Sequence, residues 1–413
     1  MLPPGPAEPA ALQTVEWIVR PTALLRRAQA RYGEPFTLRT AYWDAPLVLV
    51  SDPEEIRRIF AAPGEVLAGG EGAAFLEPFV GPTSVLVTHG DAHLRRRRRA
   101  LPPLHGEALR GWTATIAEIA HAELDNWAPG QPIKTLPRMQ ALTLEVIQRV
   151  VFGSRDPELR DALRAALDMT QSTPNLIAMS LVQRDLGPGS PFGRFLRAVE
   201  RIDALLAERL AAPAPGSVAA LLKDAVTPAE LRDQVVTLLA AGHETTATAL
   251  AWALERLARH PAELAGLRDG DDDRLDAAVK EVLRVRPVLS IASRKVREPW
   301  ELHGHTLPPG VYVGACLYLA HRRGEVWPDP TAFRPERFLN GGAPEPFAWV
   351  PFGGGVRRCL GASFAALEMR EVLRAVAARF TLRPDRPQGE RMRRRSITLA
   401  PARGGIVVPE ALA

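Results

Sequence analysis

Two cysteines, Cys316 and Cys359, could take part in metal or redox chemistry, and their surroundings separate them. They lack the close spacing of a zinc site, so each is considered alone. Cys359 follows a triple-glycine turn and precedes a helical stretch, where amide groups, the positive helix end and nearby Arg357 favour a thiolate. Cys316 lies in the apolar run 313–319 and is interpreted as a core residue. Cys359 is therefore the candidate metal ligand, the alternative being an incidental cysteine beside a glycine-rich turn.

A polar stretch with the sequence AGHETT, residues 241–246, interrupts the longest predicted helix, residues 229–260. The helix opens with a capping box from Thr227 to Glu230 and stops before Pro261. Glycine costs a helix about 1 kcal/mol, and threonine competes for backbone hydrogen bonds. Apolar flanks indicate that the helix crosses a core, so the stretch is interpreted as functional, with an exposed polar patch as the alternative.

The elements that must position these residues are mostly helical. Further helical periodicity covers residues 107–127, 142–152, 157–169, 195–210, 274–284 and 362–380. Short strands are predicted at residues 36–40, 47–51, 300–302, 311–315 and 405–408. Residues 325–347, rich in proline and glycine, predict a meandering surface segment. The fold class is therefore mainly α with small β-sheets.

Length and composition set the broad class. The 413 residues are 46% hydrophobic and 24% charged, and no linker divides them, so one domain spanning residues 1–413 is predicted, with two closely packed lobes as the alternative. Residues 1–10 form a short proline-rich tail without a signal peptide or membrane anchor, which predicts a cytoplasmic protein. Residues 95–99 are five consecutive arginines, but no aromatic interleaving supports nucleic-acid binding. An acidic protein partner is the preferred interpretation of this run.

The segment around Cys359 resembles the haem-ligand loop of the cytochrome P450 superfamily, with the form F-x-x-G-x-R-x-C-x-G. Phe352, Gly355, Arg357, Cys359 and Gly361 occupy all of its fixed positions. The resemblance extends over nearly the whole chain. It implies the cytochrome P450 fold, with haem b between the long central helix and the loop, and Cys359 as the axial iron ligand.

The same resemblance assigns roles to the polar stretch and to several basic residues. Thr245 and Glu244 are expected to be catalytic in dioxygen activation and proton delivery, and Gly242 to leave room for the oxygen ligand. Glutamate stands at position 244 where many bacterial members carry aspartate, which puts the geometry of the relay in doubt. Further cofactor-binding residues are the propionate partners His93, Arg97, Arg294 and Arg357, and the loop residues Phe352 and Gly361. His93 and Arg97 lie four residues apart and would share one face of a helix.

A structural triad is also implied by the resemblance. Glu281 and Arg284 lie on one face of the predicted helix 274–284, where alone they would be an ordinary surface pair. Residues 333–338 resemble the second half of the family's Glu-Arg-Arg triad, which Arg337 would complete. These three residues are expected to support folding and haem retention.

The substrate is expected to be an apolar small molecule, such as a terpenoid, steroid or fatty acid. The segments that vary most in the family are largely apolar here and offer few ionic groups. Several of their residues could instead simply pack the core. The candidate substrate contacts are Phe75, Phe79, Leu176, Leu238, Ala241, Val288, Leu289, Ile291 and Thr398.

The resemblance thus implies a monomeric haem-thiolate monooxygenase that uses dioxygen to hydroxylate or epoxidise its substrate. No flavin or nicotinamide fingerprint occurs in the chain, so electrons are expected from a separate ferredoxin and its reductase. Such donors are acidic and would meet the arginine-rich face. A peroxide-driven peroxygenase and a non-catalytic haem-binding carrier or sensor are the alternatives.

Overall fold

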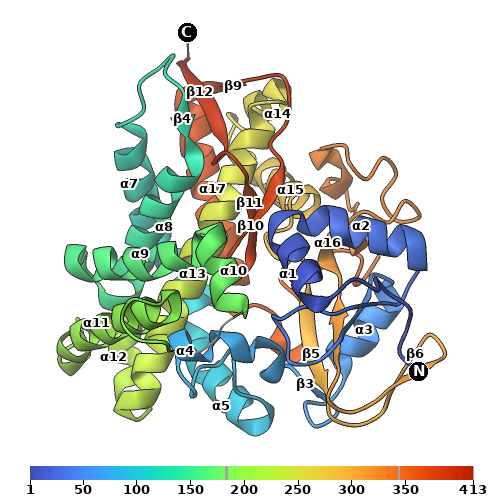
Figure 1. The fold of residues 1–413 in the computed structure, drawn as a ribbon. Helices are drawn as coiled ribbons and strands as arrows, with labels where there is room; N and C mark the ends of the chain where they lie inside the picture. The colour runs from blue at the N-terminus through green and yellow to red at the C-terminus, as the bar shows by residue number, and fades with distance from the viewer. Residues whose placement is uncertain (182–184, 343–344, 413) are drawn as a thin grey trace.

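The computed structural model describes residues 1–181, 185–342 and 345–412, and within them helices predominate over four small sheets. Most helices gather on one side of the molecule, while the largest sheet and the N-terminal helices form the other side (Figure 1). The predicted fold class, mainly α with small β-sheets, is confirmed.

Helix α13, Pro228–Leu257, runs through the centre of the helical side. Its N-cap is Thr227, whose hydroxyl accepts a hydrogen bond of 3.2 Å from the Glu230 amide, as the predicted capping box requires. The helix packs along α8, Thr135–Phe152. Its end at Leu257 comes before the predicted residue 260, because Pro261 begins the short helix α14, Pro261–Gly266.

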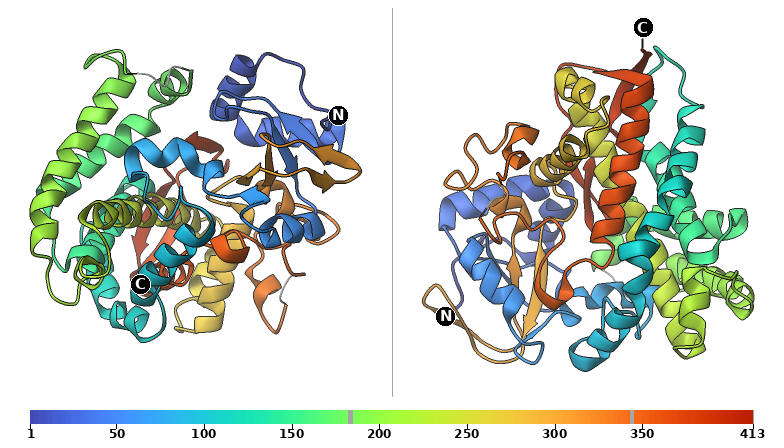
Figure 2. Two further views of the ribbon diagram at one scale, coloured as in Figure 1. Left: turned by 90° about the horizontal axis from the view of Figure 1, so that it is seen from below. Right: turned by 180° about the vertical axis from the view of Figure 1, so that it is seen from behind.

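The other predicted helices are present with shifted ends. They are α7 Thr113–Leu124, α9 Pro157–Gln171, α11 Pro191–Ala211, α15 Asp272–Val285 and α17 Ala362–Arg379. Helix α17 lies alongside α7 (Figure 2). The prediction of one continuous helix over residues 107–127 is wrong, because α6, Gly106–Gly111, ends at Trp112 before α7 begins. Helix α8 starts before residue 142 because Pro137 is tolerated in a first turn.

Several elements were not predicted from the sequence. The helices among them are α1 Ala10–Val19, α2 Pro21–Tyr32, α3 Pro53–Ala61, α4 Glu77–Val80, α10 Thr173–Leu181, α12 Val218–Lys223 and α16 Leu317–Ala320. Helix α5, Gly90–Ala100, agrees with the helical spacing expected of His93 and Arg97. The proline-rich start of the chain is not a free tail, since Thr37 donates from its amide to the Pro4 carbonyl at 2.9 Å. That the chain is one domain stays a prediction.

The largest sheet has five strands in the order β1-β2-β8-β5-β3. Their bounds are β1 Phe36–Leu38, β2 Leu47–Val50, β3 Leu67–Ala68, β5 Ala292–Val296 and β8 Tyr312–Ala315. Strands β2 and β8 pair in parallel, and the other neighbours are antiparallel. Strand β5 joins the sheet to the wall of the internal cavity described below.

Three smaller sheets complete the fold. They pair β10 Met392–Arg395 with β11 Thr398–Pro401, β6 Trp300–Leu302 with β7 His305–Leu307, and β12 Ile406–Ala411 with both β4 Ile133–Lys134 and β9 Phe380–Pro384. All five predicted strands are therefore confirmed. In residues 325–342 and 345–347, the described part of the predicted meander, the only regular element is the 3-10 turn Pro335–Phe338. None of the described helices is long and apolar enough to span a membrane.

Candidate active site

An internal cavity of about 700 Å³ lies between the middle of α13 and the loop that carries Cys359. This volume is within the range of small-molecule sites, roughly 300 to 1,000 Å³. Gly242, Glu244 and Thr245 contribute to one wall, and Cys359 and Gly361 to another. The two motifs found in the sequence therefore meet in one cavity, although more than a hundred residues of chain separate them.

Backbone packing fixes the Cys359 loop. The Cys359 amide donates to the Phe352 carbonyl at 2.9 Å and closes the turn. Gly355 has a φ of 63°, and a Cβ atom there would lie 2.0 Å from the Phe60 carbonyl oxygen of α3. Only glycine satisfies both conditions. Helix α17 starts directly after Gly361, so Cys359 precedes a helix N-terminus as predicted.

The acidity predicted for Cys359 is not borne out in this protein environment. Burial raises the pKa of its thiol, and the Gly361 amide and the charges of Arg358 and Arg97 oppose that rise without outweighing it. The side chain nevertheless opens onto the cavity, where a metal could replace the proton. Cys316 is wholly buried in a core cluster, and burial raises the pKa of its thiol, which agrees with the predicted core role.

Arg97, Arg294 and Arg357 are among the arginines at the cavity that form no ion pair with any carboxylate in the described part of the chain. Burial, and then the charges of Arg294 and Arg97, lower the pKa of Arg357 to about 9. Burial also lowers the pKa of Arg294 to about 10. Buried or partly buried cations without a counter-ion favour an anionic ligand. The two propionates of haem match this requirement.

Short contacts to backbone carbonyls hold His93 and Arg97 beside the Cys359 loop. His93 contacts the Val85 carbonyl through Nδ1 at 2.9 Å and the Val356 carbonyl through Nε2 at 3.2 Å. One turn later on α5, Arg97 donates to the Arg358 carbonyl at 2.6 Å. His93 and Arg97 thus share a face, as their spacing predicted. Burial, followed by the charge of Arg357, lowers the pKa of His93.

Gly69, which was not identified from the sequence, makes room for one of the cations. A Cβ atom at Gly69 would lie 2.3 Å from Cδ of Arg357. Arg357 extends past this glycine and donates to the Leu86 carbonyl at 3.1 Å and to the Thr88 carbonyl. A larger residue at position 69 would therefore displace the guanidinium. A lone glycine carries no sequence signal for this packing role.

Thr245 and Gly242 belong to the part of α13 that lines the cavity. The Thr245 hydroxyl donates to the Ala241 carbonyl at 2.6 Å, which leaves its lone pairs available to a cavity ligand. A Cβ atom at Gly242 would lie 2.9 Å from Cδ1 of Ile147 on α8. Gly242 thus also permits the close approach of two helices, a role that the sequence did not indicate.

Glu244 is buried and is held by two amides from other helices. Its carboxylate accepts hydrogen bonds from Gln140 of α8 at 2.6 Å and from Gln171 of α9 at 2.9 Å. Burial raises the pKa of Glu244, while the Gln140 hydrogen bond, the charge of Arg395 and the Gln171 hydrogen bond lower it. A protonated form is thus favoured more than in a solvated carboxyl group.

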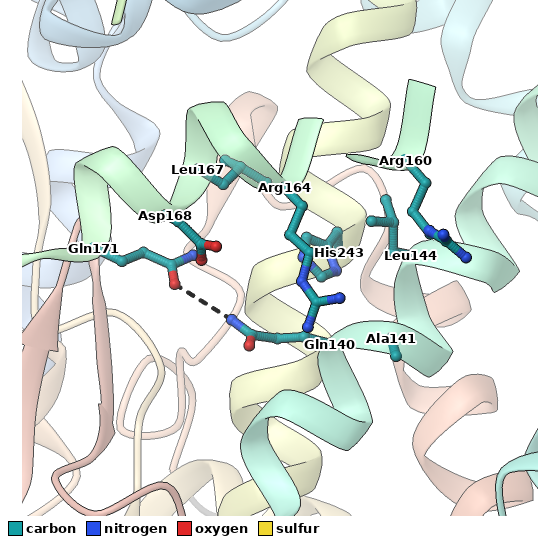
Figure 3. A pocket seen from close by; sticks show the side chains of 9 residues that line it. All are labelled: Gln140, Ala141, Leu144, Arg160, Arg164, Leu167, Asp168, Gln171 and His243. Atoms are coloured by element: carbon teal, nitrogen blue, oxygen red, sulfur yellow. Dashed lines mark hydrogen bonds between the residues drawn. The ribbon is translucent and has the colours of Figure 1, made fainter. Parts of the chain in front are cut away.

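A small second pocket adjoins this network. Gln140, Gln171 and His243 line it together with Arg164 and Asp168, as Figure 3 shows. Its volume of about 10 Å³ corresponds to roughly one water molecule. Burial lowers the pKa of His243 to about 3, so this ring is neutral. The pocket lies between α8, α9 and α13, next to the residues that hold Glu244.

The Glu281–Arg284 pair is fully buried, unlike the surface pair that the sequence alone suggested. Two hydrogen bonds of 2.7 Å join the two side chains, and Arg284 also donates to the carbonyls of Pro330 and Ala332. Nε of Arg337 lies 3.6 Å from Glu281 Oε1, longer than a hydrogen bond. The three residues predicted as a triad therefore lie together and attach the meander to α15.

Most of the predicted substrate contacts line the cavity: Phe75, Phe79, Leu238, Ala241, Val288, Leu289, Ile291 and Thr398. Leu176 belongs to α10, and its side chain falls outside the described residues. The expectation of few ionic groups is incomplete, since the buried side chain of Arg394 also lines the cavity. Sequence reasoning missed Tyr42, Trp43 and Phe195, and it did not single out Met179 and Phe192 within the segment 169–192 that it expected to contact the substrate.

Comparison with known proteins places the chain in a family. The family model described as cytochrome P450 matches residues 3–269 and 273–408. The chain is 39% identical to cytochrome P450 135B1 of Mycobacterium tuberculosis, over 98% of this chain and 90% of that protein. It is 38% identical to cytochrome P450 135A1 of the same species, over 98% and 94%.

Solved structures have the same fold. A Thermus thermophilus protein, CYP175A1, gives a TM-score of 0.78 at 29% identity over 95% of both chains. The cyanobacterial CYP120A1 with retinoic acid bound gives 0.87 at 23% identity over 100% of both chains. Together with the Cys359 loop and the unpaired cations, these matches show that the chain belongs to the cytochrome P450 family and is a monooxygenase that binds haem b and uses dioxygen.

Proposed function

We propose that this monooxygenase hydroxylates or epoxidises an apolar small molecule such as a terpenoid, steroid or fatty acid. The observation that carries the proposal is the cavity of about 700 Å³, which contacts both Cys359 and Thr245. Its walls between these residues are mainly aliphatic and aromatic, including Phe75, Leu238 and Val288. Burial of an apolar substrate there would release water from both surfaces and stabilise the complex.

In this proposal Cys359 would hold the haem iron through its thiolate, and Phe352, Gly242 and Gly361 would contact the cofactor. Arg97, Arg294 and Arg357 would neutralise the propionates through charge-assisted hydrogen bonds, and His93 would contact a propionate as a neutral ring. When bound, the haem supplies the activation of dioxygen and the transfer of one oxygen atom. Nothing lies within 4 Å of a Cβ atom built at Gly361, which supports a flat ligand at that wall.

Thr245 and Glu244 would control the supply of protons. The Thr245 hydroxyl can accept a hydrogen bond from a donor in the cavity while it donates its own hydrogen to the Ala241 carbonyl. Glu244 can hold a proton because burial raises its pKa, and rotation of its side chain away from Gln140 would carry that proton toward the cavity. The pocket beside Gln140 and Gln171 provides a place for one relay water.

We further propose that a separate ferredoxin and its reductase supply the electrons. The support is the exposed side of α5, where Arg95 and Arg98 are solvated, next to Arg358 and the exposed Val356 of the Cys359 loop. A cationic rim around an apolar patch suits an acidic donor protein. Arg96 is less available than the sequence suggested, because it forms an ion pair of 3.3 Å with Glu230. Monomeric state and cytoplasmic location stay predictions.

The proposed function is tested with purified haem-loaded protein. The reduced, carbon-monoxide-treated form should show a Soret band in the thiolate-haem region, and Cys359→Ala should lose it together with product formation. Cys316→Ala is the matched control and should keep the band. Screening apolar compounds for a substrate-induced Soret shift, followed by product analysis, would identify the substrate class.

The alternatives give different outcomes in the same experiment. A carrier would show the Soret shift without product under any electron supply. A peroxygenase would turn over with hydrogen peroxide, and Thr245→Ala would leave its coupling unchanged. If no apolar compound shifts the spectrum or is oxidised, the proposed substrate class is wrong.

A further inference from the structure

Arg394 on β10 is a buried charge that the haem site does not use. Its side chain lines the cavity and is only 4% exposed. Its guanidinium nitrogens Nε and Nη1 have no hydrogen-bond partner in the described part of the chain. Buried charged groups are normally paired, since desolvation of an unpaired ion is strongly unfavourable. The observation therefore points to a partner that the protein itself does not supply.

Aromatic rings surround this guanidinium without satisfying it. Its Cζ atom lies 4.6 Å from the ring centroid of Trp17 and 5.0 Å from that of Tyr42. Such cation–π contacts stabilise the charge but do not take the place of acceptors for its N–H groups. Burial lowers the pKa of Arg394, and the nearby Tyr42 hydroxyl group opposes that shift without outweighing it.

Two neighbours carry further polar hydrogens without partners. Oη of Tyr42 and Nε1 of Trp43 are buried atoms without a hydrogen-bond partner among the described residues, and both side chains line the cavity. The two rings lie 5.9 Å apart, with Tyr42 next to Arg394. Three donor side chains from two distant segments thus gather at one part of the wall. A ligand group that accepts several hydrogen bonds would satisfy the three donor side chains together, and an anion would do so best.

The chain holds Arg394 firmly in this orientation. In the β10–β11 hairpin Arg394 pairs with Leu399. The Leu399 carbonyl accepts from the indole of Trp252 on α13 at 2.7 Å, and its amide donates to the Val288 carbonyl at 2.7 Å. The adjacent Arg393 is exposed, as strand alternation requires. Arg394 is thereby directed inward by an element that is fixed to the cavity wall.

The donor cluster is continuous with the apolar part of the cavity. The ring of Tyr42 packs edge-on against Phe75 with centroids 6.0 Å apart, and Phe75 also lines the cavity. A ligand that satisfies the donors would therefore have an apolar body next to its anionic group.

We propose that Arg394, assisted by Tyr42 and Trp43, binds the carboxylate of the substrate, so that the substrate class is apolar carboxylic acids. This rests on the proposed function, because the acid would occupy the same cavity. A guanidinium can donate two parallel hydrogen bonds to the two oxygens of a carboxylate. The Tyr42 hydroxyl and the Trp43 indole N–H would donate further hydrogen bonds to the same oxygens. An alcohol or ester of the same carbon skeleton would leave the charge unpaired.

The test compares matched ligands in the haem-loaded enzyme. A long-chain fatty acid, its methyl ester and its alcohol, and an isoprenoid acid with its alcohol, are titrated by Soret shift and by calorimetry. Each acid should bind about tenfold or more tightly than its neutral partners, as expected for a charge-assisted interaction in a buried site. Arg394→Gln should remove that preference and change the affinity for the alcohol by less than about twofold.

Two further variants separate ligand binding from folding. Arg393→Gln, on the exposed side of the same hairpin, should keep the preference for acids. Arg394→Gln should unfold at the same or a higher temperature than the parent without ligand, because it removes an unpaired buried charge. Tyr42→Phe should weaken acid binding a few-fold. It provides the test of the proposal if Arg394→Gln does not fold.

The inference is overturned if acids and esters bind the parent enzyme equally, or if Arg394→Gln keeps the preference for acids. Failure of the proposed function has a different signature, since no apolar compound of either kind would then bind at the haem or be oxidised.

Discussion

The side-chain amide of Gln140 donates a hydrogen bond of 2.6 Å to the carboxylate of Glu244 and so joins α8 to the polar stretch of α13. Gln171 of α9 reaches the same oxygen atom at 2.9 Å. The acid that the sequence singled out is thus held by two neutral donors rather than by a salt bridge. This arrangement bears on when the acid carries a proton.

Glu244→Gln should become more stable relative to the parent as the pH rises. Burial raises the pKa of Glu244, so the group stabilises the fold below its unfolded pKa and that stability is lost as the pH rises through the folded pKa. Thermal melts between about pH 4.5 and 8 would measure the difference. Gln140→Leu removes a hydrogen bond that lowers the pKa of Glu244, so the loss of stability should occur at higher pH in this variant. A difference independent of pH would contradict the argument.

Arg357→Leu should weaken haem retention. Loss of a charge-assisted hydrogen bond in a buried site amounts to about 1.5 to 3 kcal/mol, or roughly 10- to 150-fold faster haem transfer to a scavenger protein. The matched control is Arg358→Leu, whose side chain is exposed and should leave the transfer rate within about twofold. Equal rates for the two variants would exclude a specific role for Arg357 in holding a propionate.

Glu281→Gln should strongly destabilise the fold. Both partners of the Glu281–Arg284 pair are 0% exposed, and removal of one partner from such a pair costs about 3 to 5 kcal/mol. Urea unfolding would measure this loss. Glu54→Gln breaks a pair with Arg57 of the same spacing, but both side chains are at least half exposed, so its free energy of unfolding should match that of the parent within error. Similar losses for both variants would refute the distinction.

Reversal of Arg95 and Arg98 to glutamate should slow electron transfer from an acidic ferredoxin. Both side chains are exposed on α5, and opposite charges accelerate encounter at low ionic strength. Stopped-flow reduction should show a loss of about tenfold or more at low salt that shrinks above about 0.3 M salt, where charges are screened. Arg201→Glu on α11, which is 64% exposed, is the control. Unchanged rates at low salt would place docking elsewhere.

Helices that are marked by local residue patterns could be predicted from the sequence, whereas helices that depend on tertiary packing could not. Helix α13 was found nearly in full because its cap, its apolar periodicity and the following proline are all local features. Helices α1 and α2 were missed, since packing on the sheet decides them more than periodicity does. Helix α6 was merged with α7 because the break at Trp112 has no proline to mark it.

The sequence by itself determined the candidate haem-ligand loop around Cys359 and the polar stretch at Glu244 and Thr245, because each motif needs only residues a few positions apart. Only the tertiary structure decided which side chains complete them. Gln140 reaches Glu244, and Arg394 joins Tyr42, through the packing of segments distant in the chain. The triple arginine at residues 393–395 looks uniform in sequence, yet strand alternation and desolvation make Arg394 alone an unpaired charge in the cavity.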